Sequence, residues 1–132
     1  MAKQIIKTMN APSPIGPYNQ AIKTGNLLFI SGQVALVPGT DTFITDNISK
    51  ETEQVMKNLQ AILTEAGMDF SNVVKTTIFL SDMSLFAAVN EIYGQYFSLA
   101  ITGENNYPAR ETVAVKGLPK NANVEISMIA TQ

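Results

Sequence analysis

The hydrophobic and polar positions of this 132-residue chain fall into short runs near both ends and into a helical period in the middle. Residues 4–7, 21–24 and 27–33 are predicted strands. The second and third form a hairpin, because Gly25 and Asn26 between them tolerate the positive φ of a two-residue turn. The strand at 27–33 is nearly all apolar, which predicts that both of its faces are covered.

Two stretches in the middle of the chain have the spacing of amphipathic helices. Apolar residues recur at helical intervals over 48–66, with Asp46 or Asn47 as the predicted cap and Gly67 as the predicted end. A second helix is predicted over 83–97. Its expected buried stripe consists of Phe86, Val89, Tyr93 and Phe97.

Three further predicted strands complete the pattern: 73–80, the strand that begins near Arg110, and 122–131. The order β-β-β-α-β-α-β-β predicts one α+β domain over residues 1–132, a single mixed sheet with two helices on one face. If the strand of Arg110 and the last strand are antiparallel neighbours, Glu125 lies near Arg110. The uncovered sheet face predicts association between copies, which would bring site residues from two copies together.

Composition narrows the classes of function. The net charge of −2 and the pI of about 5.0 come with scattered lysines, a pattern that argues against nucleic-acid binding. Cysteine and histidine are both absent, so the usual zinc ligands and nucleophile pairs are missing and metal-independent chemistry is expected. No segment resembles a signal peptide or approaches membrane-spanning length, which predicts a cytoplasmic protein without a membrane partner.

One permanently charged side chain stands at the start of an otherwise apolar strand within 107–115. Pro108 stiffens the approach to this strand. Alternation puts Arg110 and Thr112 on one face and Glu111 on the other, so Glu111 cannot easily neutralise Arg110. An unoccupied guanidinium suits a planar carboxylate, held through two parallel hydrogen bonds. The alternative is a surface arginine without a ligand.

Four other residues are candidates for a pocket wall. Tyr18 follows a glycine and a proline that fix its place, and a core position is slightly favoured over a pocket position. Ser31 and Gly32 end an apolar strand, where a glycine marks either a close approach of a ligand or a simple exit from the strand. Asn90 lies beside the buried stripe and needs partners, either neighbouring backbone or a ligand.

The order and spacing of several short motifs resemble the RidA/YjgF family over nearly the whole chain. The motifs are Ala11-Pro12 with Ile15-Gly16-Pro17-Tyr18, Ser31-Gly32-Gln33, Asn58-Leu59 followed by Gly67, Val74-Lys75-Thr76-Thr77, Tyr107-Pro108-Ala109-Arg110 and Leu118-Pro119. The resemblance implies a chorismate-mutase-like fold and a homotrimer with clefts between subunits. It also implies 2-iminobutanoate/2-iminopropanoate deaminase activity without a cofactor.

The same resemblance implies roles for individual residues. Arg110 would bind the carboxylate of a small 2-imino acid, and Glu125 would position the attacking water. The residues that would line or shape the cleft are Tyr18, Ser31, Gly32, Asn90 and Thr112. The reaction would convert imine or enamine intermediates, released by pyridoxal-phosphate-dependent threonine or serine dehydratases, into 2-oxo acids and ammonia.

The chain departs from better-known members of that family directly after Arg110. Glu111 and Thr112 stand where those members carry a small residue and a cysteine. A Glu111 side chain that faced the anion site would weaken binding, so the alternative function is a non-catalytic sensor that binds 2-oxo acids in the same inter-subunit cleft. A third possibility, a translation inhibitor that acts on nucleic acid, is opposed by the acidic pI.

Overall fold

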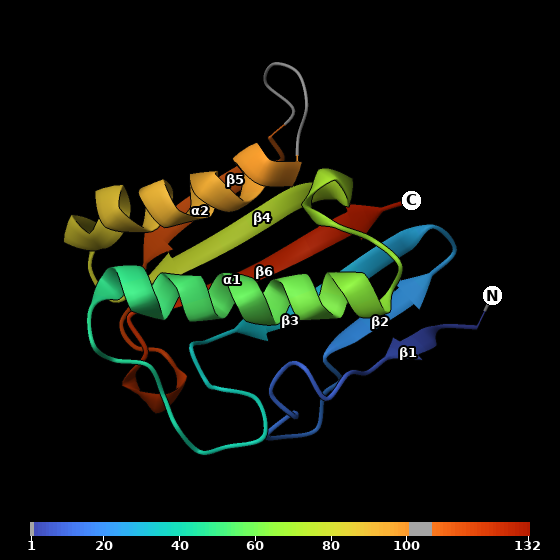
Figure 1. Cartoon of the computed structure of the whole chain (residues 1–132), viewed down its shortest axis with the longest axis horizontal. Helices are drawn as coiled ribbons and strands as arrows, with labels where there is room; N and C mark the ends of the chain where they lie inside the picture. Colours follow the sequence, from blue (N-terminus) through green and yellow to red (C-terminus); the bar gives the residue numbers. More distant parts are fainter. Residues whose placement is uncertain (1, 101–106) are drawn as a thin grey trace.

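Over the residues that the computed structural model describes, 2–100 and 107–132, six strands form one mixed sheet with two helices on one face (Figure 1). The strands are β1 (Gln4–Ile6), β2 (Ala21–Thr24), β3 (Leu27–Gln33), β4 (Val73–Leu80), β5 (Ala109–Ala114) and β6 (Val124–Thr131). The helices are α1 (Ile48–Glu65) and α2 (Phe86–Ala100), with short 3₁₀ turns at Phe70–Asn72, Met83–Leu85 and Pro119–Asn121. The predicted fold class and element order are confirmed.

The strand order is β1-β2-β3-β6-β4-β5, and every neighbouring pair is antiparallel except β4 and β5. The expected pairing of the strand of Arg110 with the last strand is therefore wrong, because β4 lies between them. The reason is the connection: α2 carries the chain from β4 back to the same end of the sheet, which makes β5 a parallel neighbour of β4.

The core lies between the sheet and the helices. Residues Val124, Ile126, Met128 and Ala130 of β6 face the helices, and none is more than 2% exposed. The apolar stripe of α1 packs against them. Asn47 caps the start of this helix, because its side chain accepts a hydrogen bond from the Lys50 N–H at 2.9 Å. The sequence also predicts a polar loop over residues 100–106; Ala100 belongs to α2, and residues 101–106 lie outside the described residues.

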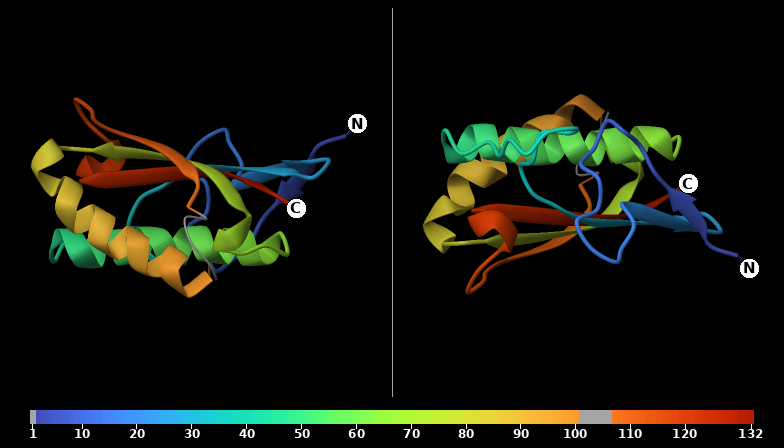
Figure 2. Two further views of the ribbon diagram at one scale, coloured as in Figure 1. Left: turned by 90° about the horizontal axis from the view of Figure 1, so that it is seen from above. Right: turned by 90° about the horizontal axis from the view of Figure 1, so that it is seen from below.

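The opposite face of the sheet carries no helix, as Figure 2 shows from two sides. Phe29 of β3 points to this open face and is 42% exposed, while Val74 and Val113 are also exposed. The expectation that β3 is covered on both faces is therefore not met within one chain. Over residues 2–100 and 107–132, no helix has the length and apolarity needed to cross a membrane.

The start of the second helix also differs from the prediction. Residues Met83–Leu85 form a 3₁₀ turn in which the Asp82 side chain accepts a hydrogen bond from the Ser84 N–H. Phe86 follows as the first residue of α2 and remains 37% exposed, so its assignment to the buried stripe is wrong. Val89, Tyr93 and Phe97 are buried as predicted.

Candidate functional site

Arg110 lies on the helix-covered face of the sheet, where β5 directs it toward α2. Its guanidinium carbon is 5.1 Å from the ring centroid of Tyr93 and 5.6 Å from that of Phe86. Tyr93 is itself held in place, because its hydroxyl donates a hydrogen bond to Thr76 Oγ1 at 3.0 Å. Burial raises the pKa of Tyr93, although the hydrogen bond with Thr76 and the charge of Arg110 act in the opposite direction. Tyr93 is thus a neutral aromatic wall.

No carboxylate of the described residues forms an ion pair with Arg110. Glu111, the nearest acid in sequence, points to the open face as the alternation predicted. Its Oε1 lies 3.0 Å from Lys75 Nζ, and its Oε2 accepts a hydrogen bond from the Thr77 hydroxyl. These contacts lower the pKa of Glu111, with Thr77 contributing most. The negative charge of Glu111 is therefore directed away from the guanidinium.

Arg110 and Tyr93 border a hollow of about 330 Å³, which we call the arginine pocket. Its lining residues are Asn90, Tyr93, Gly94, Tyr107, Pro108 and Arg110. Asn90 thus lies in the wall of a pocket, which is the second of the two positions that the sequence allowed. A hollow of this size is large enough for a small organic acid, and a guanidinium is suited to pairing with a carboxylate.

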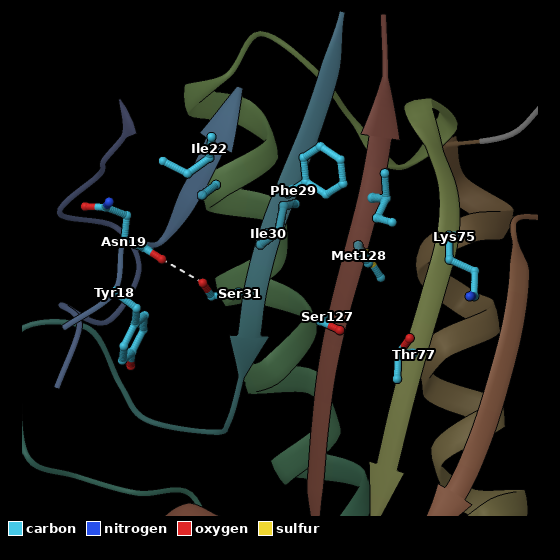
Figure 3. Close-up of a pocket in the computed structure, with 12 residues that line it drawn as sticks. Tyr18, Asn19, Ile22, Phe29, Ile30, Ser31, Lys75, Thr77, Ser127 and Met128 are labelled. Carbon is cyan, nitrogen blue, oxygen red and sulfur yellow. Dashed lines mark hydrogen bonds between the residues drawn. The ribbon is translucent and has the colours of Figure 1, made fainter. Parts of the chain in front are cut away.

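A second and larger hollow of about 460 Å³ lies on the open face (Figure 3). Its lining residues are Tyr18, Asn19, Ala21, Ile22, Phe29, Ile30, Ser31, Lys75, Thr77, Ser127, Met128 and Ile129. Tyr18 is 46% exposed, so the slightly favoured core position is wrong. Ser31 holds the loop beside it by donating a hydrogen bond to the Asn19 carbonyl at 2.6 Å.

Glu125 faces the same open side of the sheet, against a β-bulge of β3. The register shifts between Ile30 and Gln33, so that Ser31 and Gly32 together face the single residue Ser127. The Glu125 side chain then fills the space above Gly32: a Cβ on that glycine would lie 2.5 Å from Glu125 Oε2. Close approach of this side chain, rather than backbone conformation, favours a glycine here.

The Glu125 carboxyl group is half-buried, and no described residue forms a hydrogen bond or an ion pair with it. Burial raises the pKa of this carboxyl group above its ordinary value. A carboxylate with free acceptor positions and a raised pKa is suited to binding a water molecule and exchanging a proton with it.

The predicted site residues fall into two groups within one chain. Arg110, Asn90 and Thr112 belong to the helix-covered side, and the hydroxyl oxygen of Thr112 is buried without a hydrogen-bond partner among the described residues. The remaining residues, Tyr18, Ser31, Gly32 and Glu125, belong to the open face. The sheet separates the two groups, so a single chain does not assemble them into one cleft.

Sequence reasoning missed two features of the surroundings of Arg110 and Glu111. Phe86 and Tyr93 were assigned to the core, yet both contact the guanidinium of Arg110. Their separation by two helical turns was the available signal, but the same spacing describes an ordinary core stripe. The partners of Glu111 were also missed, because the parallel pairing that brings Lys75 and Thr77 beside it is not visible in the sequence pattern.

Comparisons with known proteins agree with this architecture. Residues 8–132 match the family model described as Endoribonuclease L-PSP. The chain is 47% identical over 129 residues to Reactive Intermediate Deaminase A, chloroplastic, of Arabidopsis thaliana, covering 98% of this chain and 66% of that protein. It is 41% identical over 132 residues to the human 2-iminobutanoate/2-iminopropanoate deaminase, covering 100% of this chain and 92% of the human protein.

A solved structure extends the agreement to three dimensions. The crystal structure of Escherichia coli TdcF with bound serine superposes with a TM-score of 0.90 at 36% sequence identity, covering 98% of each chain. The fold, the near-complete match to the family model and the curated relatives lead to one conclusion: the chain belongs to the RidA/YjgF family.

Proposed function

We propose that this protein hydrolyses small 2-imino acids, such as 2-iminobutanoate and 2-iminopropanoate, to 2-oxo acids and ammonia. The observation that carries the proposal is Arg110, a cation that borders an open pocket and has no carboxylate partner among the described residues. The names of the plant and human relatives describe the same chemistry for those proteins.

In this proposal Arg110 binds the substrate carboxylate through charge-assisted hydrogen bonds, each worth about 1.5 to 3 kcal/mol. The rings of Phe86 and Tyr93 fix the guanidinium, so little freedom is lost when the ligand binds. The substrate lies in the arginine pocket with its imine carbon directed outward, toward the residues that the second copy supplies. Asn90 and Thr112 would complete the binding wall.

Glu125 of the second copy then positions a water molecule against the imine carbon. Water adds to the C=N bond, and the resulting carbinolamine loses ammonia to leave the C=O bond of the 2-oxo acid. An imine carbon is already electrophilic, so orientation of the water contributes most of the acceleration. The raised pKa of Glu125 allows its carboxyl group to accept a proton from water and return it to the departing nitrogen.

The proposal requires an assembly in which the open face of one copy meets the β5 and α2 side of another. A homotrimer satisfies this requirement, and the exposed Phe29, Val74 and Val113 provide apolar surface for it. The sensor alternative was kept because Glu111 stands directly after Arg110, and the ion pair of Glu111 with Lys75 supports the enzyme rather than the sensor.

A coupled assay tests the proposal. A threonine dehydratase generates 2-iminobutanoate, and the appearance of 2-oxobutanoate is followed with and without this protein. We expect acceleration by the wild type. Binding of 2-oxobutanoate without acceleration would favour the sensor, and cleavage of added RNA by the same preparation would favour the activity named in the family model's description.

The Arg110→Lys variant is the matched test of the carboxylate clamp. An ammonium group keeps the charge but not the planar fork of donors, so we expect kcat/KM to fall about 100-fold, the loss of one or two charge-assisted hydrogen bonds. Circular dichroism should show an intact fold. Near-normal rates in a folded variant would refute the role of Arg110.

A further inference from the structure

A buried carboxylate outside both hollows binds the segment that leads into β6. Glu51 belongs to the first turn of α1 and is only 1% exposed. Its Oε2 accepts a hydrogen bond from the Asn123 backbone N–H at 2.8 Å, and its Oε1 accepts one from Asn123 Nδ2 at 3.0 Å. No cationic side chain of the described residues pairs with it, although burying a charge is unfavourable. The presence of an acidic side chain at this buried position therefore needs an explanation.

Asn123 explains why a carboxylate is needed. Its two acceptor groups are already used by Ser81, whose N–H donates to the Asn123 carbonyl and whose hydroxyl donates to Asn123 Oδ1, each at 2.9 Å. Asn123 consequently presents two donors to α1, and Glu51 is the side chain that accepts both. We call these three residues the Glu51 bracket; it joins the start of α1, the end of β4 and the entry to β6.

The segment just before the bracket is strained. Lys120 and Asn121 adopt φ angles of 59° and 55°, the left-handed region that non-glycine residues rarely occupy. Such a conformation persists only where surrounding contacts enforce it. The bracket supplies four hydrogen bonds within two residues of that turn, and Glu125 follows Asn123 by two positions.

We propose that Glu51 is a positioning residue for Glu125: through Asn123 it fixes the entry of β6 and so keeps the Glu125 side chain seated against Gly32. The inference rests on the proposed function, because only a reactive Glu125 makes its placement matter for turnover. Glu51 itself touches neither hollow.

The first experiment compares Glu51→Ala with Asn72→Ala in the full-length protein. Asn72 is the matched control, because its Nδ2 also donates a hydrogen bond to β6. It does so to the Thr131 carbonyl at 3.0 Å, at the opposite end of the strand from Asn123. We expect Glu51→Ala to lower kcat about tenfold with KM changed less than about twofold, since the arginine pocket is intact. Asn72→Ala should lose stability and keep kcat.

A second readout needs no turnover: the pKa of Glu125, followed by NMR of carboxyl-¹³C-labelled glutamate. Glu125 is identified by the signal that disappears in Glu125→Gln. Its raised pKa should move toward the ordinary value of 4.5 in Glu51→Ala and stay raised in Asn72→Ala. Should the wild type fail to hydrolyse imines, the proposed function falls and this titration alone decides the positioning. An unchanged Glu125 pKa in folded Glu51→Ala would overturn the inference.

A swap of the two bracket residues covers the case in which Glu51→Ala does not fold. In the E51Q/N123D double variant, the Gln side chain accepts a hydrogen bond from the N–H of residue 123 and donates one to the Asp carboxylate. That carboxylate still accepts a hydrogen bond from the Ser81 hydroxyl. The double variant should recover the wild-type Glu125 pKa and kcat to within about threefold, whereas N123D alone places two acids together and should lose both. Equal loss in the single and double variants would refute the bracket.

Discussion

Glu125 shows at the residue scale how a half-buried carboxyl group opposes stability. Its pKa in the folded chain is raised above the ordinary value of 4.5 by burial, so the fold disfavours its charged form. Below that ordinary value the folded and unfolded states are both protonated and the group contributes nothing. As the pH rises above it, the unfolded state loses its proton first, and the free energy of unfolding decreases.

Glu125→Gln tests this directly. We expect the variant to be more stable than the wild type near pH 7, with the difference disappearing below about pH 4, where the wild-type carboxyl group is also neutral in both states. Urea denaturation at the two pH values measures the effect. The same variant should keep its affinity for 2-oxobutanoate while kcat falls about 100-fold. A stability gain of equal size at both pH values would contradict the assignment.

Gly32 offers a second test on the same carboxyl group. A Cβ at this position would lie 2.5 Å from Glu125 Oε2 and 2.8 Å from its carboxyl carbon. The end of a half-buried side chain can move aside, so Gly32→Ala should fold and displace the carboxylate. We expect kcat to fall about tenfold, with calorimetric affinity for 2-oxobutanoate unchanged. Gly117→Ala, where the added Cβ meets no atom within 4 Å, is the control and should keep wild-type kcat.

Strand alternation at the scale of one element separates Arg110 from Glu111, although they are neighbours in sequence. The first contacts α2 and the second contacts Lys75 and Thr77 on the open face. The sequence pattern was sufficient to predict this separation, because the side-chain period of a strand needs no knowledge of its partners. It was not sufficient to predict the parallel pairing of β5 with β4, which depends on how α2 crosses the sheet.

The exposure of Tyr18, Phe29 and Phe86 was unpredictable for a related reason. An aromatic residue next to a glycine or on an apolar strand indicates burial, but it does not say whether the covering atoms come from the same chain. The first helix, whose apolar stripe and caps are local, was predicted almost to the residue: 48–66 against Ile48–Glu65 for α1. The second was predicted three residues too early at both ends, 83–97 against Phe86–Ala100 for α2.

The alternation of side chains along β5 leads to a prediction for the Glu111→Ala variant. The ion pair with Lys75 is solvent-exposed, with the Lys75 and Glu111 side chains 40% and 48% accessible, so its removal should change stability little. Because Glu111 faces away from Arg110, the KM for 2-iminobutanoate should stay within about twofold of the wild-type value, a tolerance set by the screening of exposed charges. A KM lowered tenfold would show that Glu111 acts on the anion site after all.

At the scale of the whole molecule, the division of the proposed site between two faces of the sheet predicts complementation between two inactive variants. Arg110→Ala and Glu125→Gln subunits are each expected to be inactive as homomers. If each cleft takes Arg110 from one copy and Glu125 from another, random mixing restores about a quarter of the clefts. The measurement is the coupled assay after the two variants are unfolded and refolded together. Activity that stays at the level of the separate variants would place both residues of each site in one chain.

The position of β5 as the last strand of the sheet gives its charged residues a further consequence. Its outer backbone groups have no neighbouring strand among the described residues, and an unprotected edge of this kind invites edge-to-edge pairing and insoluble aggregates. Arg110 and Glu111 interrupt that edge with opposite charges directed to opposite faces. Replacing both with apolar residues would therefore endanger solubility as well as chemistry, and low recovery of such variants would reflect loss of this protection.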